Sequence, residues 1–508
     1  MNTSFEIDPG TTPLAIWRHV LAGGSPRLNA RAIEAVVAAE GVVDDLVKSG
    51  KAVYGLNTGF GKLAHVRISD ADLSKLQQNL VMSHMTGYGD ALDADVVRLT
   101  MGLKIASLGR GASGIKLRTV RLIEAMLERG VMPKIPAQGS VGASGDLAPL
   151  AHMSAVLSGG GEAWFDGALY AGSAALQRAG LQPISLAPKE GLALMNGTQV
   201  STALAMKALF ALEKAFVAAM AIGALSTEAL AGIASPFDPR IHLLRGQPGQ
   251  IEVGNAMKSL LDGSPMRAIS VASGKVQDPY SIRCQPQVLG ACLDLIHHAA
   301  STLEIEGNAA SDNPLIFVDT GEVISGGNFH AEPIAFAADM LAMAIAEIGN
   351  LSERRCNLLL DPAFTHLPAM LTPDAGLNSG YMTAHISAAA MASENKQRAH
   401  PASIDTIPTA GNQEDHVSMA THGARRLLGM VDTLRGIMSI EALCAAQAVD
   451  LRGGQSCSPE LATVYNAIRG QAAFMPEDRP IAPDMQAVAD IIASGEIVGK
   501  TTLASFFA

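Results

Sequence analysis

The stretch Gly139–Leu150, GSVGASGDLAPL, carries the tripeptide Ala143-Ser144-Gly145 just before an acidic helix start. A tight turn there would press the backbone nitrogen of Gly145 against the carbonyl carbon of Ala143. Glycine suits this position because it has no side chain to block the approach and adopts backbone angles closed to other residues. Ring closure with loss of water, then loss of the Ser144 hydroxyl as a second water, would leave a methylidene group conjugated to the ring. The stretch is therefore a candidate for a self-made electrophile.

Two plainer interpretations compete with this chemistry. Glycine- and serine-rich turns before helices are usually simple turns or anion-binding helix N-termini. No GK[ST] follows the glycines, which argues against a phosphate loop. The same tripeptide also occurs as Ala112-Ser113-Gly114, in RGASGIKL. There Lys116, Arg118 and Arg121 follow at helical spacing, so this second copy predicts the start of a helix.

Seven further motifs accompany the first tripeptide along the chain. They are YGLNTGFG (Tyr54–Gly61), SH (Ser83-His84), MNGTQ (Met195–Gln199), QDPYSIRCQPQ (Gln277–Gln287), SDNP (Ser311–Pro314), GGNFHAEP (Gly326–Pro333) and NQEDHVSM (Asn412–Met419). In this order they resemble the aromatic amino acid ammonia-lyases, and among their branches histidine ammonia-lyase. The resemblance implies a 4-methylideneimidazol-5-one (MIO) group formed autocatalytically from Ala143-Ser144-Gly145, with no metal or nucleotide.

Composition limits the partners of the chain. Its 508 residues are 48% hydrophobic and 17% charged, with a formal net charge of −11. So little charge favours apolar surface buried between subunits. The acidic balance argues against nucleic acid or an anionic membrane as a partner. The resemblance implies a small-molecule amino acid substrate and a homotetramer whose active sites combine residues from three subunits, for which we expect D2 symmetry.

Cysteine usage and the N-terminus indicate the compartment. Five cysteines form no CxxC pair and are odd in number, which favours reduced thiols in a cytosol. The N-terminal MNTSFEIDPG lacks the basic start and apolar run of an export signal. The longest apolar stretches are interrupted by charges and do not meet the criterion for a membrane span. We therefore expect a cytoplasmic protein.

The apolar periodicity predicts a mainly α fold, a long-helix bundle of the ammonia-lyase/fumarase-like type. Strands are expected to be few and short, as at Leu315–Val318 and in a hairpin at Trp164. We predict a smaller domain over 1–197, with the Tyr54 and MIO loops, and a bundle domain with C-terminal helices over 198–508. The helices are expected over Arg31–Lys51, Leu73–Ser83, Thr198–Ser235, Pro333 towards Asp361, Tyr381–Glu394 and Val417–Ala448.

Two residues compete for the role of base in the elimination. The resemblance makes Tyr54 the candidate that takes the β-proton, although a lone tyrosine at a helix end is usually packing. Its ordinary pKa of about 10 would have to be lowered by the site. The resemblance also brings Glu414 into the pocket, either paired with the substrate imidazole or acting as base. The simpler interpretation of Glu414 is a favourable interaction with a helix dipole. The choice of base stays open.

Three more residues acquire roles in substrate binding from the resemblance. His84 would hydrogen-bond the imidazole, whereas a histidine at a helix C-terminus is otherwise a cap. Asn196 would orient the MIO group and hold the bound amine, whereas an asparagine before a helix is otherwise an N-cap. Phe329 would pack on the MIO group and the substrate.

The segment QDPYSIR places Gln277, Tyr280 and Arg283 at spacing i, i+3, i+6, and they converge if the chain turns helically after Pro279. A surface salt bridge is the simpler interpretation of an arginine. By resemblance, Arg283 forms a bidentate pair with the substrate carboxylate, for which a planar guanidinium is well shaped. Tyr280 would assist elimination, and Gln277 would hydrogen-bond nearby.

These residues together predict elimination of ammonia from L-histidine to give trans-urocanate. Deamination of tyrosine or phenylalanine is the alternative within the family, and a helical scaffold without catalysis is the alternative outside it. Met85-Thr86 stands where Ala-Ala is usual, His385 where glutamine is more familiar, and the segment before Lys275 is short. These departures concern pocket shape, so they bear on the substrate rather than on the reaction.

Overall fold

The computed structural model describes residues 4–49, 58, 67–272, 274–453 and 457–507. They form two compact units. Unit 1 comprises Met1–Lys207, Ala299–Asp339 and Pro401–Arg426, and unit 2 comprises Ala208–His298, Met340–His400 and Leu427–Ala508. A domain boundary at residue 198 stays a prediction.

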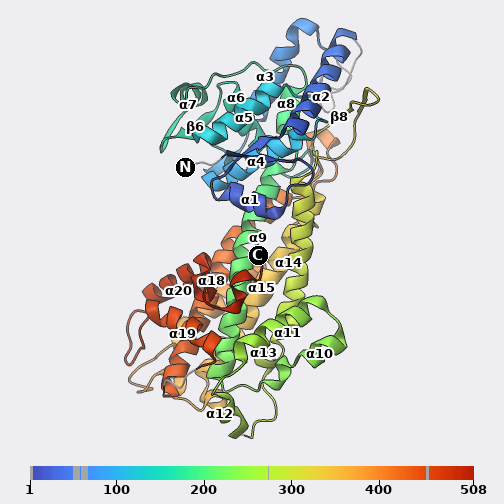
Figure 1. Cartoon of the computed structure of the whole chain (residues 1–508). Coiled ribbons are helices and arrows are strands. Elements are labelled where there is room, and N and C mark those ends of the chain that lie inside the picture. Colours follow the sequence, from blue (N-terminus) through green and yellow to red (C-terminus); the bar gives the residue numbers. More distant parts are fainter. Residues whose placement is uncertain (1–3, 50–57, 59–66, 273, 454–456, 508) are drawn as a thin grey trace. The chain divides into compact units, whose positions relative to one another are not determined.

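Most described residues are helical, which confirms the predicted mainly α fold (Figure 1). Unit 1 holds α1 (Leu14–Leu21), α2 (Ala30–Ser49), α3 (Leu73–His84), α4 (Ala94–Gly109), α5 (Leu117–Arg129), α6 (Leu147–Leu157), α7 (Gly172–Arg178) and α8 (Glu190–Met195). Unit 2 holds α10 (Pro239–Arg245), α11 (Pro248–Leu261), α12 (Arg267–Ala272), α13 (Tyr280–Arg283), α16 (Pro362–Thr365), α17 (Met382–Arg398), α19 (Pro459–Gln471) and α20 (Ala482–Ser494). Four long helices contribute residues to both units: α9 (Gln199–Ala229), α14 (Gln285–Gly307), α15 (Glu332–Leu360) and α18 (Ala420–Leu451).

The described strands are short and all lie in unit 1. They are β1 (Ser4–Ile7), β2 (Ser25–Leu28), β3 (Tyr88–Ala91), β4 (Met132–Pro133), β5 (Pro136–Gln138), β6 (Glu162–Phe165), β7 (Ala168–Ala171), β8 (Leu315–Phe317) and β9 (Glu322–Ile324). Strands β1 and β2 pair in parallel, and the pairs β3–β5, β4–β6, β6–β7 and β8–β9 are antiparallel. The hairpin at Trp164 and the strand near Leu315 are thus confirmed. Ile316 of β8 packs on Ala39 and Val43 of α2, which buries the apolar face of that helix.

Helix α9 ends earlier than its sequence predicts. We expect a helix to Ser235, but α9 stops at Ala229. Ala231 adopts a φ of +47°, and Gly232 N–H donates to Thr227 O at 2.7 Å, so the chain turns out of the helix. Inside α9, a Cβ on Gly223 would overlap Gln285 Oε1 of α14. This glycine therefore lets the two helices approach closely.

A buried ion pair ties three helices together in unit 2. Arg355 of α15 and Glu441 of α18 are fully buried, and Arg355 Nη2 donates to Glu441 Oε2 at 2.8 Å. Ser226 of α9 donates its hydroxyl to Glu441 Oε1 at 2.7 Å. Removal of one partner from such a pair costs about 3–5 kcal/mol, because the other charge stays buried.

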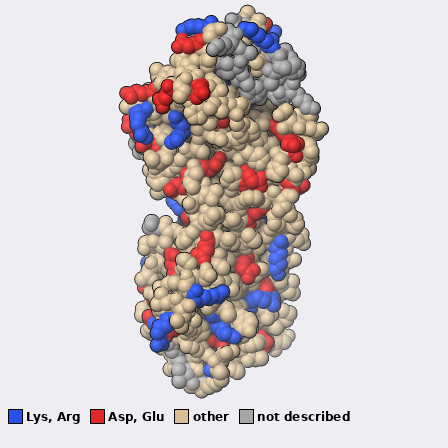
Figure 2. All heavy atoms as spheres, turned by 90° about the vertical axis from the view of Figure 1, so that its right-hand side faces the viewer, with Lys and Arg blue, Asp and Glu red and all other residues tan. Residues whose placement is uncertain are grey.

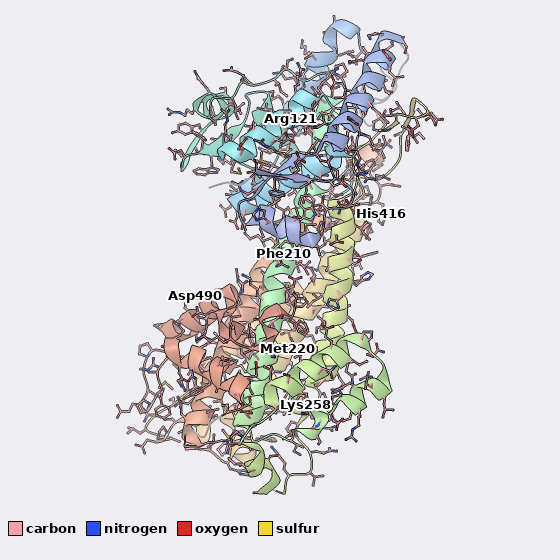
Figure 3. The ribbon with its side chains drawn as sticks, in the orientation of Figure 1. Arg121, Phe210, Met220, Lys258, His416 and Asp490 are labelled. Atoms are coloured by element: carbon pink, nitrogen blue, oxygen red, sulfur yellow. The ribbon has the colours of Figure 1, made fainter. Side chains whose placement is uncertain are left out.

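Contrary to the sequence expectation, helices α9 and α15 are long and apolar enough to span a membrane, but most of each apolar window is buried inside the protein. Of their most apolar windows, 89% and 72% are buried inside the protein, whereas a membrane helix presents its apolar side chains to lipid. Phe210 and Met220 mark the course of α9 in Figure 3, and both are buried.

Among the described residues, two short 3₁₀ turns lie in unit 1 and four lie in unit 2. These 3₁₀ turns are η2 (Asp70–Asp72), η3 (Ser235–Phe237), η4 (Ala369–Leu371), η5 (Ala410–Asn412), η6 (Glu496–Val498) and η7 (Thr502–Ser505). The turn η5 leads the chain towards Glu414 without a following helix, since α18 begins only at Ala420.

Candidate active site

The tripeptide loop lies in unit 1 against the MNGT segment. Gly145 has a φ of +71° and forms a bridge with Gly197. A Cβ at position 145 would overlap the backbone of Gly197, so only glycine fits. The next residue, Asp146, donates its N–H to Gly197 O at 2.7 Å. The two motifs are therefore held backbone to backbone.

The atoms that ring closure would join are free of competing partners. Among the described residues, neither the carbonyl oxygen of Ala143 nor the N–H of Gly145 takes part in a hydrogen bond. Ser144 O, by contrast, accepts a hydrogen bond from Asn196 Nδ2 at 2.6 Å. The tripeptide thus fits the MIO group that the resemblance implies, since closing the ring would break none of these hydrogen bonds.

Asp146 is a buried acid whose role in joining several segments was not predicted from the sequence. The residue precedes α6, but its carboxylate does not cap that helix. Its Oδ2 accepts from Val200 N at 3.0 Å and from Ser201 N at 2.8 Å, so it caps the start of α9 instead. Its Oδ1 accepts from the hydroxyls of Ser140 at 2.9 Å and Thr421 at 2.5 Å. The only signal in the sequence was its place directly after Ala143-Ser144-Gly145.

Glu414 contacts the tripeptide directly. Its Oε1 accepts the hydroxyl of Ser144 at 2.5 Å, and its Oε2 accepts that of Thr409 at 2.6 Å. The interpretation of Glu414 as an acid at a helix start is wrong, because α18 begins only at Ala420. The fold brings a carboxylate from 270 residues away onto the hydroxyl that MIO formation would expel.

Asn196 does not cap the long helix that follows it. It is the C-terminal cap of α8, and α9 begins three residues later. Its side chain is buried, with Nδ2 on Ser144 O. Its Oδ1 is buried without a hydrogen-bond partner in the part of the chain that the structure describes. A buried acceptor without a donor is costly, so this oxygen is suited to receive a ligand N–H.

Two more motif segments border the tripeptide loop. Ala331 N–H donates to Gly142 O at 3.2 Å, which fixes the loop that carries the half-buried Phe329. Ser418 Oγ also donates to Gly142 O, at 3.0 Å, and Met419 N–H donates to Val141 O at 2.9 Å. The segments with Phe329 and with Glu414 therefore meet at this loop.

His84 is the last residue of α3, as the sequence predicts. Its Nδ1 lies 2.8 Å from Leu80 O and 3.1 Å from Ser83 Oγ. A neutral ring that donates from Nδ1 to a carbonyl keeps Nε2 as an acceptor. These contacts of the His84 ring with described residues stay within α3 and do not join it to Glu414.

The predicted carboxylate-binding residues lie in unit 2. Helix α13 begins at Tyr280 directly after Pro279, so the predicted helical turn is present. Arg283 donates from Nε to Asp278 O at 3.0 Å, and its guanidinium lies 4.6 Å from the centre of the Tyr280 ring. Its terminal nitrogens have no hydrogen bond to any described residue. They are therefore available for a bidentate anion.

A cavity of about 300 Å³ in unit 2 includes this arginine. Gln277, Asp278 and Arg283 supply its polar wall, and Ile241 and Val276 supply apolar wall. Gln277 and Arg283 thus share one cavity, as their spacing predicts. The Tyr280 ring is 71% exposed. Tyr54 lies outside the described residues, so its role stays a prediction.

One group of described residues offers metal-type ligands. His330, Glu332 and His416 place ligand atoms within 4.8 Å of one another in unit 1, where Figure 3 labels His416. However, His330 turns Nδ1 to Glu332 Oε2 at 3.8 Å and Nε2 to His416 Nδ1 at 3.5 Å. Glu332 Oε2 has no hydrogen-bond partner among the described residues, so of these two contacts only the one between His330 and His416 is a hydrogen bond. The absence of a catalytic metal stays a prediction.

Known proteins are similar to this chain in sequence and in fold. A family model described as aromatic amino acid lyase matches residues 14–470. Histidine ammonia-lyase from Trypanosoma cruzi is 37% identical and superimposes with a TM-score of 0.90, over 97% of this chain and 94% of that one.

Two aminomutases are also similar. Phenylalanine aminomutase from Pantoea agglomerans is 31% identical, with a TM-score of 0.93 over 96% of this chain and 99% of that one. Tyrosine aminomutase from Streptomyces globisporus is 32% identical, with a TM-score of 0.92 over 98% of each chain. The resemblance drawn from the ordered motifs is confirmed, and the chain belongs to the aromatic amino acid lyase family.

Proposed function

We propose that this chain is an MIO-dependent ammonia-lyase that converts L-histidine to trans-urocanate and ammonia in histidine catabolism. The observation that carries the proposal is the environment of Ala143-Ser144-Gly145. The carbonyl and the nitrogen to be joined are unpaired among the described residues, and the hydroxyl to be lost lies on Glu414. When formed, the MIO group would supply an electrophile that makes an amine a better leaving group.

The residues of the chain would divide the remaining tasks. Asn196 Oδ1 accepts an N–H of the substrate amine, since this buried oxygen has no other donor among the described residues. Arg283 binds the carboxylate with its terminal nitrogens, and the ring of Tyr280 keeps the guanidinium in place. Phe329 packs on the substrate, and Gln277 hydrogen-bonds near Arg283.

Removal of the β-proton requires a base near the tripeptide. Glu414 satisfies this requirement by position, because its carboxylate already contacts Ser144. Tyr54 is the second candidate by its motif. As the base takes the β-proton, the electron pair of that C–H bond forms the Cα–Cβ double bond of urocanate, and the amine leaves with the electron pair of its C–N bond.

Histidine is the proposed substrate because Ser83-His84 and Glu414 supply polar groups for an imidazole. His84 Nε2 would accept the imidazole N–H, since Nδ1 is engaged with Leu80 O. The 37% identity to a histidine ammonia-lyase supports the same choice. Phenylalanine or tyrosine is the alternative, which the similarity to two aminomutases keeps in view.

We propose that the enzyme is a homotetramer whose subunits share active sites, and that it is located in the cytoplasm. Large apolar side chains of unit 2 are exposed in the single chain, among them Leu244 at 91% and Val276 at 89%. On the face shown in Figure 2, neutral side chains predominate and charges are scattered. Such surface favours burial by further copies. All five cysteines are free, which suits a reducing compartment.

The test is ammonia release from purified protein offered L-histidine, L-tyrosine and L-phenylalanine separately, with intact-mass measurement in parallel. The proposal expects release from histidine and a mass lower than the sequence by two waters. Release of ammonia only from tyrosine or phenylalanine would show that histidine is not the substrate, while the type of reaction would stay as proposed. An unchanged mass with no release would support the non-catalytic scaffold instead.

A further inference from the structure

A buried lysine lies one contact behind the site. Lys104, in α4, is 1% exposed. Its Nζ donates to Asn196 O at 2.9 Å and to Ala193 O at 3.2 Å, both at the end of α8. No described carboxylate lies within ion-pair distance of this Nζ. Burial of a lysine whose direct partners are carbonyls is unfavourable, so the interaction needs a reason beyond packing.

The contacts of Asn196 supply that reason. Its main-chain oxygen is held by Lys104, and its side-chain nitrogen holds Ser144 O at 2.6 Å. The following residue, Gly197, accepts the N–H of Asp146 through its own carbonyl at 2.7 Å. The Asn196-Gly197 corner is thus fixed by Lys104 through the Asn196 carbonyl, and by the tripeptide loop and Asp146 through Asn196 Nδ2 and Gly197 O.

We infer that Lys104 is a positioning residue that holds Asn196 against the tripeptide, both for formation of the electrophile and for binding of the substrate amine. The inference rests on the proposed function. If the corner rotates, Nδ2 leaves Ser144 O and the unpartnered Oδ1 changes its aim. Catalytic geometry tolerates displacements of well under about 1 Å, so loss of this anchor reaches the chemistry without touching a reacting atom.

The charge of Lys104 is compatible with this role. Burial lowers its pKa to about 7, while Asp312 and Asp146 act to raise the pKa and Lys189 to lower it. A neutral amine has two N–H hydrogens and an ammonium has three. Both forms can therefore serve the two carbonyl acceptors.

Lys189 is the informative contrast. It is equally buried, but its Nζ pairs with the carboxylate of Asp312 at 3.1 Å. Its positive charge is neutralised locally by a side chain that belongs to no proposed catalytic group. Lys104 instead donates to the main chain of Asn196, the residue that contacts Ser144.

The experiment compares Lys104→Met, Lys104→Arg and Lys104→Gln in the full-length protein. Methionine fills similar apolar space without a donor, arginine restores N–H donors, and glutamine has donors that reach less far. Lys207→Met is the matched control, because Lys207 pairs with Asp93 at 2.7 Å and Asp95 at 2.8 Å away from the tripeptide. Folding of each variant is checked by circular dichroism and native mass.

The first readout is the rate at which newly made chain loses two waters, measured by intact mass. The second is kcat and KM for L-histidine, with kcat divided by the matured fraction. Lys104→Met is expected to mature more slowly and, once matured, to lose roughly tenfold or more in kcat. Lys104→Arg is expected to recover most of both, and Lys207→Met to match the unchanged protein.

Maturation and turnover of Lys104→Met at the rate of the unchanged protein would overturn the inference. If Lys104→Met does not fold, Lys104→Gln takes its place with the same expectation, and a folded Gln variant with full rates would be equally fatal. Failure to recover with arginine would reduce Lys104 to a packing residue. An unchanged protein that itself loses no water would instead overturn the proposed function, a result that is distinct from all of these.

Discussion

Two copies of Ala-Ser-Gly occur in unit 1, and their carbonyl and hydroxyl groups make different contacts. Gly114 and Gly145 have nearly the same φ, +66° and +71°. In the first copy, Ser113 is 1% exposed and donates to Asp312 Oδ1 at 3.1 Å. The carbonyl of Ala112 accepts the N–H of Ile316 at 2.8 Å. The first copy therefore has its hydroxyl and its carbonyl engaged in the core.

In the second copy, the alanine carbonyl and the serine hydroxyl have different surroundings. The carbonyl of Ala143 has no hydrogen bond to another described residue, and Ser144 is half-buried with its hydroxyl on Glu414. Gly145 lies against the backbone of Gly197. A left-handed glycine after serine is thus common to both copies. What separates them is how the neighbouring segments use the carbonyl and the hydroxyl.

The largest expected difference follows removal of each serine hydroxyl. Ser144→Ala cannot form the methylidene group, so ammonia release should fall by a factor on the order of 10³ or more. Ser113→Ala loses one hydrogen bond to Asp312 and should keep the reaction. Ammonia release and intact mass measure both effects. Equal activity of the two variants would remove the distinction between the copies.

A methyl group on each glycine is the next comparison. In Gly145→Ala the new Cβ overlaps the backbone of Gly197, which cannot move aside, so the loss of two waters should stop. In Gly114→Ala the Cβ meets methyl groups of Ile316 and Val43, and alanine is strained at a φ of +66°, but the backbone oxygen of Ala39 is 3.7 Å away. That variant should lose about 1–3 kcal/mol of stability and still mature.

Intact mass and thermal melting separate these two outcomes. A Gly145→Ala chain that loses two waters at the normal rate would contradict the assignment of the reactive turn. Failure of Gly114→Ala to mature while folded would show that the first copy also contributes to the chemistry.

The carboxylates beside the two serines should differ in kind of effect. Glu414→Gln removes a proposed base, so kcat should fall by roughly 10²–10⁴ with little change in melting temperature. Asp312→Asn leaves Lys189 buried without its carboxylate, so the unfolding free energy should fall by about 3–5 kcal/mol. Steady-state kinetics and denaturant unfolding report the two quantities. A large loss of kcat at unchanged stability in Asp312→Asn would reverse the assignment.

The last comparison concerns pH and Lys104, which holds the carbonyl of Asn196 behind the second copy. The pKa of Lys104 is lowered from 10.5 to about 7 by burial, so the unfolded chain binds more protons than the folded one between these values. Stability contributed by this group should therefore rise as pH increases from about 7 to 10.5, and change little below 7. Melting curves of Lys104→Met should lack this part of the slope. Identical pH dependence in both proteins would show that the pKa is not lowered.

Local sequence was sufficient for most helices. Apolar periodicity predicts α2, α3, α15 and α18 to within a few residues, because each buries one continuous face. The ordered motifs gave the family. The predicted end of α9 at Ser235 is wrong, since Ala231 and Gly232 turn the chain out of the helix where composition still favours one.

The roles of individual polar residues depended more on the fold. Asn196 and Glu414 were each compatible with a helix-end interaction, and neither makes one of the predicted kind. Asp146 and Lys104 carried no signal of their contacts with α9 and Asn196. Sequence spacing cannot reveal such partners, because they lie tens to hundreds of residues away.

The sequence by itself determined that this chain is a mainly helical member of its family, and it predicts the tripeptide that would cyclise. Those properties are written in local chemistry: the size of glycine, the hydroxyl of serine and the period of apolar residues. The tertiary structure decided which Ala-Ser-Gly is left with a free carbonyl and a carboxylate on its hydroxyl. That choice depends on hydrogen bonds between residues far apart in the sequence. Such bonds act over only about 3 Å, so they form only once the distant segments have packed together.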